Sequence, residues 1–487
     1  MGGILQTYAR QSAPPEHRVE LFVRGETRLT WIGLLFNEYP NAEVYLVGGT
    51  LRDIILGRVP NDIDLLVRNV PPAELDIWLN AHGASEFVGR FGTYKFVPHG
   101  NVNKQAIDIA LPRTERKLED HAGGRRDMDV SFDYKLPIKD DLARRDFTIN
   151  AMAYNIKTGR LIDPFLGLQD LYNELINAVL VPATRFEEDA TRLLRGLRFA
   201  SQLNFGIEKL TWQAILANIE LLNKKAPTED GTRAYIVPRE AIGREFILGF
   251  MEHPVHTLRL WSESKALHMF MPELAELEFK NDNELQKTLN LLNTLKNKSF
   301  IASYGYLNTP LNVLVAGLMV FTHGDKHKHA HNICTKLHFH QFPPDHKASM
   351  NCETIKWLVE HVDMFEEIDP ASIRPSQFEK MFLSKRGQEL LLLMHAKHIA
   401  SAKHSVARER LHTARRIKDA MQTIFADSDL NGRLPQLISG RDIQEFGILP
   451  GPTYREILDE VRDAQLAGEI VSFDDAKTFL RHIVNKI

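Results

Sequence analysis

One stretch of the sequence constrains the fold more than any other part of the chain: Gly48–Val67, which reads GGTLRDIILGRVPNDIDLLV. Val44–Val47 comes directly before it and predicts a buried strand, because these residues are all apolar or aromatic. Two glycines then separate this strand from a short predicted helix, Thr50–Leu56, and Gly57 ends the helix. Glycine lets the backbone approach a ligand closely and directs N–H groups at phosphate, although a tight turn alone would also use it. The stretch therefore predicts a phosphate site between a strand and a helix of a mixed α/β unit.

Two carboxylates lie at the start of a second predicted strand, Asp62–Val67. Asp62 and Asp64 are at positions i and i+2, so both side chains project to one side of the strand while Ile63 points into the core. Two like charges on one face repel unless a cation bridges them. Mg²⁺ prefers carboxylate and phosphate oxygens, and a pair of such ions can stabilise the attacking and leaving oxygens of phosphoryl transfer. The pattern therefore predicts a magnesium site, against the alternative of two solvated aspartates.

A third carboxylate and an arginine add to this predicted site. Asp108 lies in the alternating apolar run Ala106–Ala110, within the predicted strand Gln105–Leu111. A surface-facing aspartate is the alternative interpretation at this position. Arg52 falls in the first turn of the predicted Thr50–Leu56 helix, where its guanidinium could reach the same phosphates.

The character of the chain changes near Pro164. Before it, Phe87–Val97 predicts another strand. Arg113–Asp141 is polar and too long for an ordinary connection, which indicates either a disordered segment or a functional loop. From Leu168 onward, apolar residues recur at helical spacing and the alternation of strands is nearly absent. The clearest helical segments are Asp189–Leu203, Trp212–Leu222, Glu240–Phe250, Glu284–Leu295, Ala407–Phe425 and Thr453–Leu466. The expected fold class is α+β.

The composition is that of an ordinary globular protein, with 44% hydrophobic and 25% charged residues among 487. No apolar stretch is long enough to span a bilayer, so we expect no membrane association. Cys334 and Cys352 are too few for a disulfide framework and favour a reducing cytoplasm. The formal net charge of −3 means that any contact with nucleic acid must come from a local basic surface.

Gly48–Val67 resembles the signature of the class II tRNA nucleotidyltransferase and bacterial poly(A) polymerase family. Four further stretches are similar to motifs of that family, in the same order. They are the entry to its flexible loop (Arg113–Lys117), its ribose-recognition motif (Arg144–Met152), its hinge between head and neck (Asp163–Gly167) and its base-selecting motif (Glu188–Arg195). The resemblance implies a polymerase-β-like nucleotidyltransferase head with a mixed sheet and helices, followed by an all-helical neck, body and tail. The implied boundaries are 1–165 for the head, 166–250 for the neck, 251–375 for the body and 376–487 for a tail that docks tRNA.

The resemblance also implies the activity: template-independent addition of C, C and A to tRNA 3′ ends from CTP and ATP, with Mg²⁺ as cofactor and pyrophosphate as product. No obligate protein partner is evident. The implied catalytic residues are Asp62, Asp64 and Asp108, of which Asp62 and Asp64 would bind metal. The implied nucleotide-binding residues are Gly48, Gly49, Arg52, Arg145, Asp146, Asp189, Arg192 and Arg195, with Arg145 and Asp146 at the ribose.

Asp189 and Arg192 suit base selection. They are expected at positions i and i+3 of one helix, hence on one face. A carboxylate accepts a hydrogen bond from an exocyclic amine, and a guanidinium donates to ring acceptors. Cytosine and adenine offer an amine beside an acceptor, whereas uracil and guanine carry a carbonyl in place of that amine. One such pair could therefore admit C and A without a template. Glu188, Arg195 and Arg198 either brace it, contact phosphate or form helix-surface salt bridges.

Several other functions remain open. A poly(A) polymerase shares the head, but Gly89–Gly92 lacks the doubled arginine typical of polymerases and the C-terminus has no basic tail. An A-adding tRNA nucleotidyltransferase is a second alternative, and an RNA-binding module on an inactive scaffold is a third. Loss of one paired aspartate would be expected in an inactive scaffold, and both are present. The histidine-rich segment His323–His331 is more typical of a solvated turn or an RNA-facing segment than of a metal site.

Overall fold

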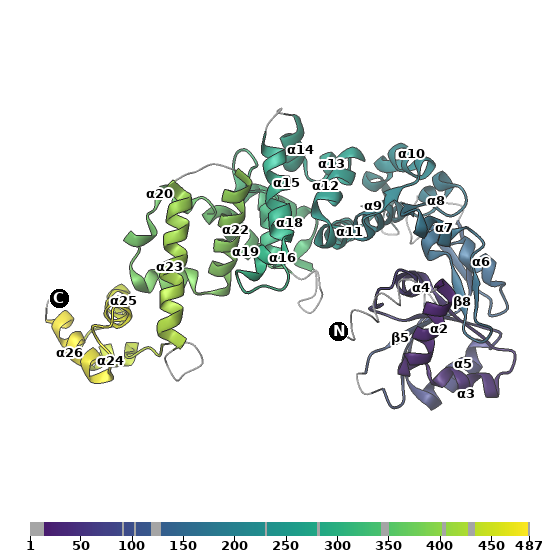
Figure 1. Ribbon diagram of the computed structural model, residues 1–487, viewed down its shortest axis with the longest axis horizontal. Coiled ribbons are helices and arrows are strands. Elements are labelled where there is room, and N and C mark those ends of the chain that lie inside the picture. Colours follow the sequence, from purple (N-terminus) through teal and green to yellow (C-terminus); the bar gives the residue numbers. More distant parts are fainter. Residues whose placement is uncertain are drawn as a thin grey trace. The chain divides into compact units, whose positions relative to one another are not determined.

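The computed structural model describes residues 14–89, 92–101, 104–117, 128–228, 231–279, 283–341, 350–401, 406–426 and 434–485. The chain divides into two compact units, Met1–Ala266 and Leu267–Ile487. Strands occur in the first unit, and the described part of the second unit is helical (Figure 1). The predicted α+β class is confirmed.

A seven-stranded sheet forms the centre of the N-terminal part of the first unit, in the order β3-β4-β5-β2-β1-β8-β9. The strands are β1 (Glu43–Val47), β2 (Asp64–Arg68), β3 (Gly83–Val88), β4 (Thr93–Pro98), β5 (Ile107–Ala110), β8 (Ala153–Asn155) and β9 (Arg160–Ile162). β2 and β5 run parallel and the other neighbours antiparallel, so the sheet is mixed. Val44, Leu46, Tyr45 and Val47 alternate between the faces of β1 and are all buried, so both faces of the sheet centre are covered.

Helices α2 (Pro15–Gly25), α3 (Trp31–Glu38), α4 (Gly48–Ile55), α5 (Pro72–His82) and α6 (Ile138–Ala143) surround this sheet. Trp31 of α3 lies between Trp78 of α5 and Phe96 of β4, with ring centroids 5.8 and 5.3 Å away. This aromatic group buries one face of the sheet. Tyr45, Leu66, Ile138 and Leu142 belong to one buried cluster that includes α6.

Three details of the head differ from the prediction. Phe87–Val97 is not one strand but the end of β3 and most of β4, joined where Gly92 adopts φ +58°, a conformation that favours glycine. The second predicted strand begins at Asp64, so Asp62 precedes it. Within Arg113–Asp141, β6 (Arg113–Lys117) pairs with β7 (Met128–Phe132), and α6 follows; residues 118–127 lie outside the described residues. Ion pairs among Arg113, Glu115 and Arg144 join this ribbon to α6, and an apolar pattern carries no information about such pairs.

The rest of the first unit is mainly helical. It comprises η4 (Thr148–Asn150), α7 (Gly167–Tyr172), α8 (Pro182–Glu188), α9 (Thr191–Leu203), α10 (Lys209–Asn218), η5 (Ile219–Asn223), α11 (Arg239–Glu252) and α12 (Pro254–Glu263). Two small ribbons interrupt it: β10 (Leu175–Ile176) with β11 (Gly206–Ile207), and β12 (Lys225–Pro227) with β13 (Arg233–Tyr235). Gly249 of α11 lies against Ser201 of α9, where an added Cβ would approach the serine Cβ to 3.1 Å. This close approach joins the helix that carries the predicted base-selecting motif to α11.

The second unit consists of α13 (Ala266–Phe270, which starts at the boundary), α14 (Pro272–Phe279), α15 (Asn283–Lys296), α16 (Lys298–Ala302), α17 (Leu311–Gly317), α18 (Lys326–Lys336), α19 (Cys352–His361), α20 (Met364–Glu367), α21 (Pro375–Phe382), α22 (Lys385–Ser401), α23 (Val406–Ala426), α24 (Gly440–Glu445), α25 (Pro452–Leu466) and α26 (Phe473–Val484). Leu390–Met394 of α22 is fully buried, as its continuous apolar run requires. α24, α25 and α26 form a separate core around Ile443, Ile457 and Leu480.

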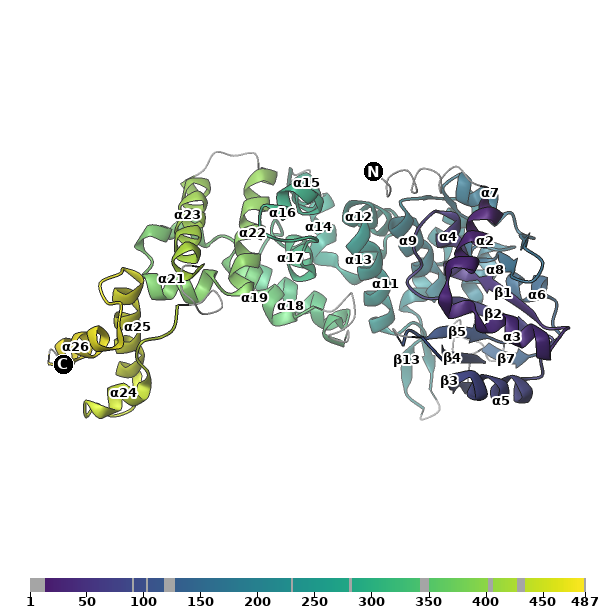
Figure 2. The same cartoon turned by 60° about the horizontal axis from the view of Figure 1, so that its bottom comes forward.

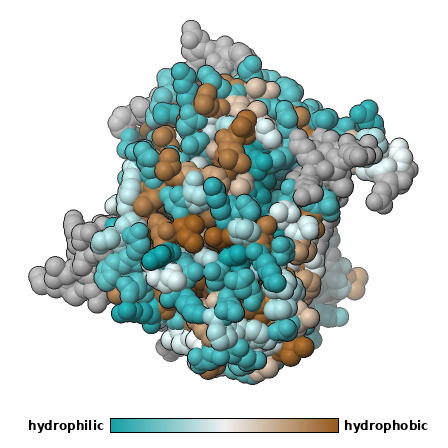
Figure 3. Space-filling model, turned by 90° about the vertical axis from the view of Figure 1, so that its right-hand side faces the viewer, coloured by the Kyte–Doolittle hydropathy of each residue, from teal (hydrophilic) through white to brown (hydrophobic). Residues whose placement is uncertain are grey.

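The histidine-rich segment and the distribution of apolar residues bear on two of the expectations from the sequence. His323–His331 lies at the start of α18, where His323 pairs with Glu284 at 2.6 Å and His329 contacts Thr322. In the described part of the chain, no helix is both long and apolar enough to cross a bilayer. On the face drawn in Figure 3, hydrophilic residues predominate and hydrophobic ones gather in a band across the middle.

Candidate nucleotidyltransferase site

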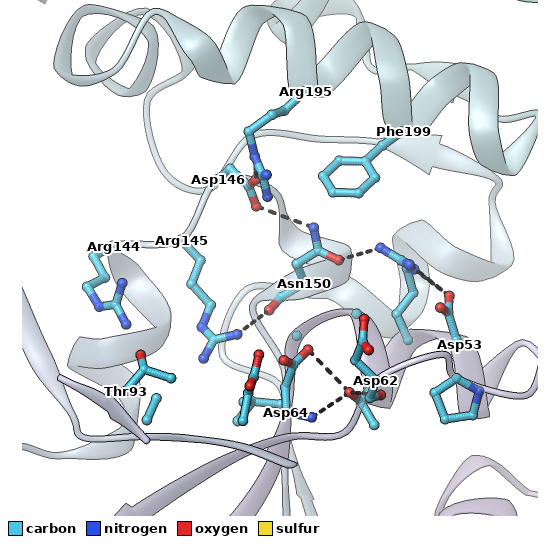
Figure 4. Close-up of a pocket in the computed structure, with 18 of the residues that line it drawn as sticks. Asp53, Asp62, Asp64, Thr93, Arg144, Arg145, Asp146, Asn150, Arg195 and Phe199 are labelled. Atoms are coloured by element: carbon cyan, nitrogen blue, oxygen red, sulfur yellow. Dashed lines mark hydrogen bonds and ion pairs between the residues drawn. The ribbon is translucent and has the colours of Figure 1, made fainter. Parts of the chain in front are cut away.

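A cavity of about 790 Å³ opens in the first unit between the sheet edge, α4, η4 and α9. Its size is within the range of small-molecule sites, roughly 300–1,000 Å³. Every residue that the sequence predicted for the site lines it: Gly48, Gly49, Arg52, Asp62, Asp64, Asp108, Arg145, Asp146, Asp189, Arg192 and Arg195. Figure 4 shows carboxylates from the sheet on one side and Asp146, Arg195 and Phe199 on the opposite side. Residues up to 147 positions apart in the sequence are thus brought together.

The two glycines are the first residues of α4 rather than a turn before it. Gly48 has φ +63°, and a Cβ there would lie 3.2 Å from Arg145 Nη1 and 3.6 Å from an Asp64 carboxylate oxygen. A side chain at position 48 would therefore strain the backbone and crowd the contact between these two charged groups. The open N-terminus of α4 directs its first N–H groups toward the cavity, which suits an anion.

The acidic side of the cavity is a row across three strands. Asp64 on β2 is in register with Asp108 on β5, and Asp108 is in register with Lys95 on β4. Lys95 Nζ donates to Asp108 Oδ1 at 2.9 Å. Asp62, which is exposed, lies just before β2. The row brings three carboxylates and one lysine to the same edge of the cavity.

Asp64 is the most constrained of these acids. The Thr50 hydroxyl on α4 accepts from Asp64 N at 2.8 Å and contacts Asp64 Oδ2 at 3.2 Å. Burial raises the pKa of the Asp64 carboxyl, and the charge of Asp108 raises it further, while Thr50 and Arg145 act in the opposite direction. The carboxylate cluster therefore carries negative charge that the protein does not fully compensate.

The donor chemistry at this edge fits a hard divalent cation. Carboxylate oxygens are the ligands that Mg²⁺ prefers, and a cation would offset the burial and the Asp108 charge that together raise the pKa of Asp64. Asp62 and Asp64 fit this role directly, whereas Asp108 is paired with Lys95. Among the described residues, no three His, Cys, Asp or Glu side chains are arranged to hold a metal.

An arginine-rich wall faces the acids. Arg52 donates to Asn150 Oδ1 at 2.9 Å, and Asn150 Nδ2 donates to Asp146 Oδ1 at 3.3 Å. Arg195 Nε donates to Asp146 Oδ2 at 2.7 Å. Burial alone would raise the pKa of Asp146, but the Arg195 guanidinium holds it well below its usual range. The ring of Phe199 lies 5.3 Å from Arg52, 5.2 Å from Arg195 and 4.1 Å from Arg198, so it supports three guanidinium groups.

The predicted helical relation between Asp189 and Arg192 is wrong. Asp189 is extended (φ −147°, ψ 100°) between α8 and α9, and only Arg192 lies on α9. Asp189 Oδ1 accepts from the Thr191 N–H at 2.9 Å and from its hydroxyl at 2.6 Å. Aspartate competes for nearby backbone donors in this way, which favours helix starts over helix interiors. Both side chains nevertheless line the cavity and are less than 10% exposed.

Arg192 is oriented by several partners. Its Nη1 donates to Glu188 Oε2 at 2.8 Å and to the Arg185 carbonyl at 3.2 Å. Its Nη2 donates to the Arg144 carbonyl at 3.0 Å. A guanidinium has five N–H donors, so Nε and one Nη2 hydrogen make no further hydrogen bond among the described residues, although Nη2 also forms an ion pair with Glu115 Oε2 at 3.8 Å.

Sequence reasoning missed several lining residues: Thr50, Glu115, Arg144, Asn150, Phe199 and Arg244. It also missed Lys95, which pairs with the lining residue Asp108. Thr50 and Asn150 lie inside the recognised motifs but carry no charge that would draw attention. Glu115 pairs with Arg144 at 2.9 Å, and Arg144 pairs with the fully buried Asp141 at 2.7 Å. These contacts join β6 to α6. Residue spacing could not reveal them, because they depend on how the ribbon docks.

A strand–glycine–helix unit with carboxylates on the next strand faces an arginine-lined cavity, an arrangement suited to binding a nucleoside triphosphate and a divalent cation. Residues 44–177 match the family model described as the Poly A polymerase head domain. This part of the chain is thus similar to a poly(A) polymerase head domain, and the curated relatives that it matches are CCA-adding enzymes.

The chain is similar to curated CCA-adding enzymes over part of its length. It is 38% identical to that of Streptococcus suis (strain 05ZYH33) over 186 residues, which are 37% of this chain and 42% of the relative. It is 37% identical to that of Lactiplantibacillus plantarum over 236 residues, 48% of this chain and 52% of the relative. The matched regions thus span about half of these relatives or less.

Solved structures resemble the chain over nearly its whole length. One is the CCA-adding enzyme of Bacillus stearothermophilus in complex with CTP, with a TM-score of 0.63, 20% identity, and 97% of this chain and 98% of that chain covered. Another is the Thermotoga maritima CCA-adding enzyme complexed with tRNA_CCA, with a TM-score of 0.60, 21% identity, and 96% and 98% covered. At these identities the likeness establishes the fold.

Proposed function

We propose that this protein adds C, C and A to the 3′ end of tRNA from CTP and ATP and releases pyrophosphate. The observation that carries the proposal is one cavity. The acidic row on the sheet lines one side of it, and Asp189, Arg192 and the arginine-rich wall also line it. Two comparisons support the proposal: the curated relatives that the N-terminal part matches are CCA-adding enzymes, and structures of similar fold are complexes with CTP, ATP or tRNA.

Each lining residue has a role in this proposal. Asp62 and Asp64 hold Mg²⁺, which supplies charge stabilisation for the attacking and leaving oxygens when bound. Asp108 positions the RNA 3′-hydroxyl. Gly48, Gly49 and Arg52 bind the triphosphate at the N-terminus of α4. Arg145 and Asp146 hold the ribose hydroxyls, and Arg195 keeps Asp146 ionised.

Base choice belongs to Asp189 and Arg192. Asp189 Oδ1 is engaged by Thr191, and within the described residues no hydrogen bond occupies Oδ2. Oδ2 accepts from the exocyclic amine of cytosine or adenine, and the remaining Arg192 donors bind the neighbouring ring acceptor. Uracil and guanine would place a carbonyl against the carboxylate, which is repulsive. Glu188 orients Arg192 from the preceding helix.

We also propose that the chain has the four parts that the resemblance implies. The head would extend over residues 1–165, the neck over 166–250, the body over 251–375 and the tail over 376–487. The tail would dock tRNA by shape and phosphate contacts. The protein would act in the cytoplasm.

The decisive experiment incubates the protein with tRNAs that end in the discriminator base, C or CC, and with each labelled NTP separately. Addition of C to the first two substrates and of A to the third supports the proposal. Addition of A alone to the CC end would identify an A-adding enzyme, and long A tails a poly(A) polymerase. Binding of tRNA without any incorporation would identify an inactive RNA-binding scaffold.

A further inference from the structure

A short β-hairpin stands out from the start of α11 (Figure 2). It is formed by β12 and β13 and lies between η5 and α11. Lys225 pairs with Tyr235, Ala226 with Ala234, and Pro227 with Arg233. None of the roles proposed above uses this hairpin.

The two faces of the hairpin differ in chemistry. Directly paired residues, and residues two apart on a strand, project to the same side of an antiparallel ribbon. One face therefore carries Lys225, Pro227, Arg233 and Tyr235, and the other carries Ala226 and Ala234. We call the first the basic face; its lysine, arginine and tyrosine are all exposed.

Cations surround the aromatic ring of the basic face. Lys225 Nζ lies 4.6 Å and Arg239 Cζ 3.6 Å from the ring centroid of Tyr235, which is 37% exposed. The hydrogen bond and charge of Arg239 lower the pKa of the Tyr235 hydroxyl. An exposed ring among cations is the combination that binds single-stranded nucleic acid, in which bases stack and phosphates are neutralised.

The hairpin is anchored at its base. Ile236 N donates to the Lys224 carbonyl at 3.0 Å, and Leu222 and Val237, which flank the hairpin, are fully buried. At the other end, Thr228 N donates to the Thr232 carbonyl at 2.8 Å. A surface that is already ordered loses little conformational entropy when it binds a partner.

Helix α11 connects the base of the hairpin to the lining of the cavity. Arg239 and Arg244 are both on α11, and Arg244 lines the cavity. Five residues of helix correspond to about 7.5 Å along its axis, roughly the length of one or two nucleotides of a strand. The chain as a whole has a net charge of −3, so RNA binding requires such a local basic surface.

We propose that the basic face of the β12–β13 hairpin binds the single-stranded 3′-terminal nucleotides of the RNA acceptor just before they enter the cavity. Lys225 and Arg233 contact phosphates, and the Tyr235 ring stacks on a base. This inference rests on the proposed function, because that function makes an RNA 3′ end the acceptor.

Charge reversal tests the phosphate contacts. Lys225→Glu and Arg233→Glu should each raise the KM for tRNA ending in CC about tenfold, while the KM for ATP stays within about twofold. Each should also lower the slope of log Kd against log salt for a fluorescent single-stranded RNA by about 0.7. Lys209→Glu, the same reversal on the exposed start of α10, is the matched control. Hairpin variants that bind RNA as this control does would overturn the inference.

Substitution of the ring tests stacking. Tyr235→Ala should weaken RNA binding about tenfold, and Tyr235→Phe should restore it, because a phenyl ring retains a face on which a base can stack. Equal loss in both variants, or an equal rise in the KM for ATP, would mean that the hairpin supports the fold instead. Thermal melting of each variant checks folding.

The two proposals fail in different ways. If the wild-type protein incorporates no nucleotide, the proposed function fails, while RNA anisotropy still reports on the hairpin. If the wild-type protein extends tRNA and the hairpin variants bind RNA normally, only the hairpin inference fails.

Discussion

The carboxylates on the acidic edge have different surroundings, and this has consequences for mutation. Asp62 is exposed before β2, whereas Asp64 is held by Thr50 and has a raised pKa because of burial and Asp108. Asparagine has nearly the same shape as aspartate, so each substitution removes the charge and keeps the volume of the side chain. These substitutions should therefore affect chemistry more than folding.

Asp62→Asn and Asp64→Asn should each reduce nucleotide incorporation by about 10³-fold or more, because metal-assisted charge stabilisation supplies several kcal/mol of the barrier reduction. Gel-shift affinity for tRNA should stay near that of the wild type. Asp76→Asn on α5, the same chemical change away from the cavity, is the control. Activity within about tenfold of wild type for both variants would contradict the metal assignment.

Asp189 and Arg192 should control which base is accepted. Replacing either with Ala leaves polar atoms of the base without a hydrogen-bond partner in a desolvated pocket, which costs about 1–3 kcal/mol of binding free energy for each group. The same substitution removes the unfavourable contact that excludes U and G. Discrimination should therefore fall faster than the rate, as measured by competing CTP, ATP, UTP and GTP. Glu187→Ala, on the exposed side of α8, should change neither. Unchanged CTP and ATP preference in both variants would place base selection elsewhere.

At the scale of elements, buried ion pairs join β6 to α6. Asp141 is fully buried, contacts Arg144 at 2.7 Å and Arg145 at 3.2 Å, and accepts from the Arg113 N–H at 3.3 Å. Burial raises the pKa of Asp141, but the two arginine charges outweigh this and lower it. The carboxylate thus orients two arginines that line the cavity.

Asp141→Asn should destabilise the first unit by about 3 kcal/mol, because breaking a buried pair leaves an uncompensated charge. The pKa of Asp141 is lower in the folded protein than in the unfolded chain, where it is about 3.9. The stabilisation by the Asp141 carboxylate is therefore fully present above the unfolded-state pKa and is lost as the pH falls through the folded-state pKa. The difference between wild type and variant in urea unfolding should therefore shrink below about pH 4. Asp140→Asn, an exposed neighbour on the same helix, is the control. A constant difference from pH 7 to pH 3 would contradict this role.

The segment between β6 and β7 can be shortened without changing either strand. Replacing residues 118–127 with a short glycine turn leaves β6, β7 and the pair between Glu115 and Arg144 in place. C addition should be spared and A addition impaired at least about tenfold, since we expect the second step to need a reshaped base pocket. Single-turnover assays with tRNA ending in C and in CC separate the two steps. Equal loss of both would assign the segment to folding.

At the scale of the whole molecule, the two units divide the proposed work. Every residue of the cavity lies in Met1–Ala266, and Leu267–Ile487 has helical cores of its own. The nucleotide site should therefore survive separation from the second unit, whereas tRNA docking should not.

A protein comprising residues 1–266 should bind CTP within about threefold of the full chain in isothermal titration, because the fold unit that lines the cavity is complete. Its KM for tRNA should rise at least about tenfold, which corresponds to about 1.4 kcal/mol of lost binding. Circular dichroism and a cooperative melt confirm that the piece is folded. An unchanged KM for tRNA would remove the second unit from substrate docking.

The local part of this protein could be predicted from its sequence. Alternation around Asp62-Ile63-Asp64, the glycines before Thr50–Leu56 and the helical periodicity after Leu168 depend on neighbours in the chain, and the structure confirms the elements that they predict. The resemblance to known motifs predicted the site residues, and in the structure every one of them lines the same cavity.

Tertiary structure decided the remainder. The Lys95–Asp108–Asp64 row depends on strand register, and the link from Glu115 through Arg144 to Asp141 depends on the docking of a ribbon held by charge. Asp189 lies before α9 rather than within it, because its carboxylate accepts a hydrogen bond from the Thr191 N–H at the start of that helix. Such contacts join groups through space or compete with helix formation locally, and hydrophobic periodicity carries no information about either.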